Sequence, residues 1–200
     1  MIGGKNRAMT RNRFIIGMVL LVLLGAIAGC AVGLEQPETV NTLTIQGRVI
    51  VDAYHYDEAT GEYVHFYHHE SSNLVVDLGE EWIETQLGSD SPTNVSAQWI
   101  SLSMDATAPA AGWVAIIAEI DTAGGLDRAL GTYSDQGNGA WNIANQFNAD
   151  ATYNNVQLTG LQWGDIGTDN LLAANQFITP VTLNNGDALT VTWELSVSGP

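Results

Sequence analysis

The C-terminal end of the chain carries its most regular pattern of apolar and polar positions. Every second residue is apolar in the series Leu189, Val191, Trp193, Leu195 and Val197, and the residues between them are hydroxylic or acidic. A period of two places the two sets on opposite faces of a β-strand, so this segment predicts a strand with one buried face. Asn184-Asn185-Gly186-Asp187, which precedes it, is typical of a turn.

Shorter alternating stretches occur earlier in the chain. Residues 49–54 alternate, and residues 63–69 follow after a glycine-containing turn at 57–62. Two such stretches joined by a turn are typical of a β-hairpin, which we predict over residues 54–67. Residues 97–104 and 141–148 predict further strands.

Residues 79–87 have helical spacing instead. Trp82, Ile83 and Leu87 share one face of a helix, and Glu80, Glu81 and Glu84 point away from it. Many short strands, Gly- and Asn-rich turns and one short helix predict an all-β fold. We expect an antiparallel β-sandwich of about seven to nine strands, jelly-roll or immunoglobulin-like.

The N-terminal 30 residues follow a different pattern. Lys5, Arg7, Arg11 and Arg13 precede an apolar run from Phe14 to Gly29 that contains no charge. A basic flank, an apolar segment and small residues at its end are the parts of an export signal. Because the basic flank stays in the cytoplasm, we expect the rest of the chain to be extracytoplasmic and attached to the membrane.

The end of this leader, Ile27-Ala28-Gly29-Cys30, resembles the lipobox of lipoproteins. Cys30 is the only cysteine, and we expect its thiol to be lipidated. Two alternatives stay open: residues 14–34 are long enough for an uncleaved anchor, or the signal is cleaved and the protein released. The expected organisation is a leader or anchor at 1–29, a tether at 30–42 and a β-sandwich domain at 43–200.

Charge limits the partners of the mature chain. From Cys30 onward two basic residues, Arg48 and Arg128, stand against all 22 acidic residues, a formal net charge of −20. Such a surface repels nucleic-acid phosphates and anionic headgroups, so we expect no nucleic-acid partner and a membrane contact only through the N-terminus. A chain of this length buries enough core to fold as one domain without a disulfide.

The predicted hairpin gathers tyrosines and histidines, and we expect an interaction surface there, formed by Tyr54, Tyr56, Tyr63, His65 and Tyr67. A metal site is the alternative. In a regular strand His65 and His69 lie about 13 Å apart, and His68 and His69 face opposite ways. Only His55 and His65, paired across the hairpin, would reach one ion, with Glu70 or Asp57. We therefore assign no metal site from the sequence.

Other chemistry is sparse. Residues 135–139 and 165–170 are acidic, Gly- and Asn-containing stretches that make Ca²⁺ the one cofactor to consider, although neither has EF-hand spacing. The sequence has no nucleophile elbow, zinc-peptidase motif or phosphate-binding glycine loop. Glu80, Glu81 and Glu84 fit a solvated helix face better than a glycosidase carboxylate pair. We expect no catalysis.

Three further features concern single residues. Six tryptophans raise the possibility of sugar stacking, and Trp113 beside Gly112 is the ring that we expect to be most exposed. Glu119 and Arg128 are predicted to form a partly buried structural ion pair. Asn94 begins an Asn-Val-Ser acceptor for N-glycosylation.

From about residue 70 onward the chain resembles a loose family of virion-type β proteins of phages and archaeal viruses, described as tail or appendage components. The matching stretches are 72–79, 100–103 with 105–109, 119–120 with 125–129, 171–177, and 180–193. The resemblance implies a β-sandwich and brings no catalytic residues. Such proteins normally lack an export signal, which shifts the expectation toward a cell-surface protein that shares the module.

Together these features favour a membrane-anchored, surface-exposed structural or interaction protein, adhesive or part of an appendage, with a protein or glycan partner. The first alternative is a carbohydrate- or calcium-binding extracytoplasmic module, and the second is a virion tail or appendage protein. Self-assembly is also open, with residues 36–46 supplying a strand to a neighbouring copy.

Overall fold

The computed structural model describes residues 44–90, 95–121, 124–165 and 169–199. All of them belong to one compact unit, Val40–Pro200. The expected leader, the tether and Asn94 lie outside the described residues.

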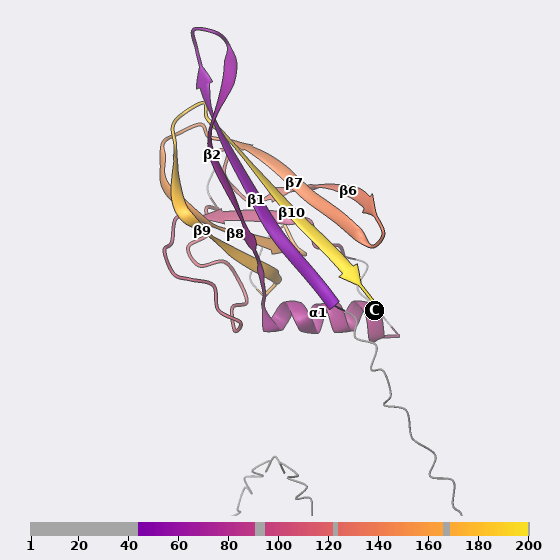
Figure 1. Cartoon of the computed structure of the whole chain (residues 1–200). Helices are drawn as coiled ribbons and strands as arrows, with labels where there is room; N and C mark the ends of the chain where they lie inside the picture. Colours follow the sequence, from indigo (N-terminus) through magenta and orange to yellow (C-terminus); the bar gives the residue numbers. More distant parts are fainter. Residues whose placement is uncertain (1–43, 91–94, 122–123, 166–168, 200) are drawn as a thin grey trace, which may run out of the picture. The chain divides into compact units, whose positions relative to one another are not determined.

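Ten strands and one helix form this domain within the described residues (Figure 1). In chain order they are β1 (Thr44–Asp57), β2 (Glu62–Ser72), β3 (Leu74–Val75), α1 (Asp77–Gly88), β4 (Trp99–Ser103), β5 (Ala129–Leu130), β6 (Thr132–Gly137), β7 (Ala140–Asn148), β8 (Tyr153–Gln162), β9 (Leu171–Leu183) and β10 (Ala188–Ser198). The predicted all-β class and the single helix are confirmed. The described residues contain more strands than the seven to nine predicted, because two short strands, β3 and β5, have only two residues each.

The strands form two antiparallel sheets of five. The first sheet has the order β2-β1-β10-β7-β6, and the second has the order β3-β9-β8-β4-β5. The first and last strands therefore lie side by side in the middle of the first sheet, paired from Thr44↔Ser198 to Tyr54↔Ala188.

The core lies between the two sheets. Val51 and Trp193 of the first sheet and Ile100 and Leu161 of the second are fully buried in one apolar cluster. The alternation predicted for 189–198 is confirmed, because its apolar residues lie on the buried side of β10 and its hydroxylic residues are partly or fully exposed. Burial of these side chains is the main driving force for the fold.

The opposite face of the second sheet is covered too. Ile116, from the long connection between β4 and β5, packs with Val76, Leu171 and Ala174 in a second apolar cluster. Every residue of β8 from Val156 to Gln162 is consequently buried. This strand has no apolar–polar alternation because neither of its faces meets solvent.

Helix α1 packs against the second sheet. Trp82 stacks on Trp163 with ring centroids 5.5 Å apart, and Gly79 is buried against the backbone of Leu172. The three glutamates of the helix are exposed, as predicted. Leu87 is 69 % exposed, so the predicted apolar face is shorter than expected and ends at Ile83.

Candidate functional site

The β1–β2 hairpin extends beyond the rest of the first sheet. Strand β10 pairs with β1 only as far as Tyr54, whereas β1 and β2 pair on to Asp57↔Glu62. The last turn of the hairpin therefore projects past its neighbour, which is visible as the indigo-to-purple loop at the top of Figure 1. The hairpin predicted from the sequence is present.

A β-bulge at Phe66 decides which side chains share a face. Ala53 is opposite Tyr67 and Tyr54 is opposite His65, which leaves Phe66 as an extra residue in β2. The extra residue reverses the alternation of all residues after it. His65 and His68 consequently lie on the same face of the sheet, although their spacing of three would separate them in a regular strand.

Strict alternation, which the sequence analysis assumed, was wrong for two residues. Tyr67 lies on the core side, where its hydroxyl donates to the carbonyl oxygen of Thr179 at 2.6 Å. Partial burial raises the pKa of Tyr67 to about 12. His69 is 5 % exposed and contacts the ring of Phe177, so it does not share the face of His65. Its burial lowers its pKa.

The other four residues of the expected interaction surface lie together on the outer face, turned away from the core. Tyr54 contacts His65 with ring centroids 5.1 Å apart, and Tyr56 contacts Tyr63 at 5.3 Å. Tyr56 and Tyr63 are 45 % and 48 % exposed. We call Tyr54, Tyr56, Tyr63 and His65 the hairpin face.

The hairpin tip is held in a defined conformation. Asp57 accepts hydrogen bonds from the backbone N–H of Ala59 at 2.9 Å and from the hydroxyl of Thr60 at 3.0 Å. These bonds, chiefly that from Ala59, lower the pKa of Asp57. Gly61 adopts a φ of 71°, a region open to glycine at little cost, and donates to the carbonyl of Asp57. The aromatic side chains are therefore presented on a preorganised turn.

Two histidines of the outer face meet one carboxylate. Asp52 Oδ1 lies 3.0 Å from His65 Nε2 and 2.8 Å from His68 Nδ1. Among the described residues this is the one group of three or more His, Cys, Asp or Glu whose ligand atoms lie within 4.8 Å of one another.

The predicted pairing of His55 with His65 across the hairpin was wrong. His55 is opposite Val64, and its Nδ1 lies 2.8 Å from Asp187 at the turn before β10. Its ring stacks on Phe66, with centroids 3.7 Å apart, on the other side of the hairpin. Asp52 was missed because only the bulge, for which the sequence has no clear signal, places both His65 and His68 beside it.

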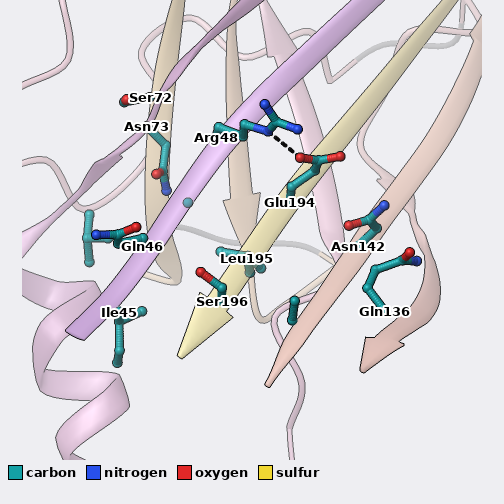
Figure 2. A pocket seen from close by; sticks show the side chains of 13 residues that line it. Ile45, Gln46, Arg48, Ser72, Asn73, Gln136, Asn142, Glu194, Leu195 and Ser196 are labelled. Atoms are coloured by element: carbon teal, nitrogen blue, oxygen red, sulfur yellow. Dashed lines mark hydrogen bonds and ion pairs between the residues drawn. The ribbon is translucent and has the colours of Figure 1, made fainter. Parts of the chain in front are cut away.

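A broad hollow of about 830 Å³ lies farther along the first sheet. Figure 2 shows Arg48 reaching Glu194, with Asn142, Gln136 and Ser196 nearby. Arg48 also pairs with Glu70, and these two carboxylates raise its pKa. The described residues that line the hollow include no aromatic ring, so it offers amides and hydroxyls but no platform for a sugar.

Glu119 and Arg128 form a bidentate ion pair. Arg128 Nε donates to Glu119 Oε1 at 2.7 Å and Nη2 donates to Oε2 at 2.5 Å, while Nη1 donates to the carbonyl of Gly164 at 3.0 Å. The two side chains are only 9 % and 15 % exposed. The pair joins Glu119, within the long β4–β5 connection, to Arg128, the residue directly before β5.

The tryptophans and acidic turns offer less than the sequence suggested. All six tryptophans are half-buried or buried, including Trp113, which packs against the second apolar cluster. Asp135 accepts a hydrogen bond from the N–H of Gly137 in the β6–β7 turn, as ordinary turns do. The stretch 165–170 lies partly outside the described residues.

The remaining expectations fall mostly outside the described chain. Cys30 and Asn94 are not among the described residues, nor is most of the segment 36–46. Its last three residues, 44–46, already pair with β10 in their own sheet. Within the described residues no helix is long and apolar enough to span a membrane.

Comparison with known proteins adds no relative. Searches found no family model, no curated protein and no solved structure that matches this chain.

Proposed function

We propose that this protein is a membrane-anchored, surface-exposed structural or interaction protein that contacts its partner through the hairpin face. It acts as an adhesive or appendage component and not as an enzyme. Lipidated Cys30 holds it at the membrane on the extracytoplasmic side. A jelly-roll or immunoglobulin-like type of sandwich is part of the same proposal.

The projecting hairpin is the observation that carries the proposal. Tyr56 and Tyr63 of the hairpin face are 45 % and 48 % exposed, on a turn whose shape is fixed by Asp57. Exposed aromatic side chains that are already ordered lose little entropy on binding, so they are effective contact residues. An amphipathic surface of this kind suits a protein or a glycan partner.

The direction of the hairpin supports the same role. β1 begins at Thr44, beside the end of β10, and runs for 14 residues toward the hairpin tip. At about 3.3 Å per residue, the tip lies roughly 45 Å from Thr44. The aromatic tip therefore lies at the opposite end of β1 from Thr44, where the described part of the domain begins.

The alternatives have weaker support. A carbohydrate-binding module is expected to expose a tryptophan platform, whereas the tryptophans here are half-buried or buried. The resemblance to virion-type proteins concerns the β-sandwich and leaves the leader unexplained. We therefore keep the carbohydrate role as an outcome of the crosslinking test below, and the calcium and virion roles as alternatives.

The attachment is tested by metabolic labelling with an alkyne fatty acid. The full chain should incorporate the label and fractionate with membranes, and Cys30→Ser should lose the label. Intact, unlabelled protein in the cytoplasmic fraction would contradict the proposed location.

The contact surface is tested by photo-crosslinking in cells that express the full chain. A benzoylphenylalanine placed at Tyr63 should form a specific adduct, which mass spectrometry identifies as protein or glycan. The matched control is Tyr133, 53 % exposed on β6, where no such adduct is expected. Adducts of equal yield at both positions, or at neither, would reject the hairpin face as the contact surface.

A further inference from the structure

The geometry points to a binding site for a late first-row divalent metal ion, such as Zn²⁺, Cu²⁺ or Ni²⁺, formed by Asp52, His65 and His68. The ligand atoms come from β1 and β2 and lie within 4.8 Å of one another. This site does not depend on the proposed contact role of the hairpin.

The bulge at Phe66 creates the site. Because β2 holds one extra residue between His65 and Tyr67, His65 and His68 both lie on the side of Asp52, one on each side of the bulge. Bulges commonly occur where a side chain must be re-aimed for a functional purpose. The same bulge aims Tyr67 into the core, where its hydrogen bond to Thr179 holds it.

Two of the three spacings between the ligand atoms are close to those around a tetrahedral ion, and all three atoms lie within 4.8 Å of one another. With metal–ligand distances of about 2.0–2.1 Å, neighbouring ligand atoms lie roughly 3.3 Å apart. Asp52 Oδ1 is 3.0 Å from His65 Nε2 and 2.8 Å from His68 Nδ1. Small rotations of the side chains, two of which are exposed, would admit an ion in place of the two hydrogen bonds.

The ligand set selects the class of metal. Two imidazoles and one carboxylate suit Zn²⁺, Cu²⁺ and Ni²⁺, whereas Ca²⁺ and Mg²⁺ take oxygen ligands. Three protein ligands leave a coordination position on the solvent side for water or a group of a partner. The net charge of the domain is strongly negative, which further favours a cation.

The competing interpretation is a hydrogen-bonded triad without a metal. In that state each imidazole donates an N–H to Asp52 Oδ1. Metal binding requires both of these nitrogens to lose their protons, so the proton moves to Nδ1 of His65 and to Nε2 of His68. The two interpretations thus predict different imidazole tautomers.

The test is isothermal titration of the untagged full chain in detergent with ZnCl₂ and, separately, NiCl₂, because a histidine tag would itself bind both ions. One ion should bind per chain. Loss of a residue that only hydrogen-bonds to a metal ligand commonly weakens metal binding 10- to 100-fold. Loss of a ligand itself should weaken it at least as much, so His65→Gln and His68→Gln should each weaken metal binding at least about tenfold. His55→Gln is the matched control, since His55 is an exposed histidine of the same hairpin, and this variant should bind as the unaltered chain does.

A second measurement reports the geometry directly. Nitrogen-15 NMR of the histidine rings should show, on adding ZnCl₂, that His65 binds through Nε2 and His68 through Nδ1. Absence of saturable binding at millimolar metal, or binding that survives in the double variant H65Q/H68Q, would overturn the assignment. Circular dichroism verifies that the variants keep the fold, which is expected because both side chains are about half exposed.

Discussion

The ion pair between Glu119 and Arg128 gives the sharpest stability prediction. Arg128→Met removes the bidentate contact and leaves the Glu119 carboxylate, 15 % exposed, without its cation. Breaking one partner of a buried pair costs about 3–5 kcal/mol, and the residual exposure here favours the lower value of about 3 kcal/mol. For a domain of this size we expect the melting temperature to fall by about 6–12 °C.

The double variant Glu119→Leu with Arg128→Met tests whether the loss of stability in Arg128→Met comes from the isolated Glu119 carboxylate. Replacement of both charges by apolar side chains leaves no isolated carboxylate. The double variant should therefore lower the free energy of unfolding less than Arg128→Met alone. Urea unfolding of the full chain, followed by tryptophan fluorescence, measures each variant. The buried Trp193 makes this signal sensitive to loss of the core.

Arg48→Met is the matched control, because Arg48 and Arg128 are the two basic residues of the described domain. Arg48 also joins two carboxylates, but its side chain is 51 % exposed, so solvent screens the interaction and the effect should be much smaller. Equal effects of the two arginine substitutions, or an unchanged melting curve for Arg128→Met, would refute the reasoning from burial.

Two other substitutions test features of the fold. The raised pKa of Tyr67, about 12, means that the folded state resists ionisation, so stability should fall as the pH rises from about 10 toward 12. Tyr67→Phe should remove the last phenolate step in absorbance at 295 nm, whereas persistence of that step would show that another tyrosine causes it. Gly79→Ala should destabilise the protein by about 1–3 kcal/mol despite better helix propensity, because the new Cβ overlaps the backbone of Leu172. Gly88→Ala, in the same helix with nothing within 4 Å of its Cβ, is the control and should be neutral or slightly stabilising when measured by urea unfolding.

The sequence pattern predicts strands and helices best where one face of the element meets solvent. The alternation of 189–198 and the three glutamates of α1 led to the correct strand and helix. Strand β8 gave no such signal, because the β4–β5 connection covers the face that solvent would otherwise reach. The pattern of residues within β8 cannot reveal that a segment distant in the sequence packs over this face.

The candidate site was predictable only in part. The concentration of tyrosines and histidines in one hairpin is visible in the sequence, and so is the charge complementarity of Glu119 and Arg128. The bulge at Phe66 is not visible in the sequence. The one-residue shift that it introduces moves every later side chain of β2 to the other face of the sheet. It removed Tyr67 from the expected surface and brought Asp52 beside two histidines.

The neighbouring positions of β1 and β10 constrain how the chain acquires its structure. The middle of the first sheet joins residues from opposite ends of the domain, so this sheet cannot be completed before the last strand has been synthesised. Contacts between such distant parts of a chain form slowly because a long loop must close first. The polypeptide therefore stays without its central strand pair during most of translation, which suits the proposed export of the chain before it folds.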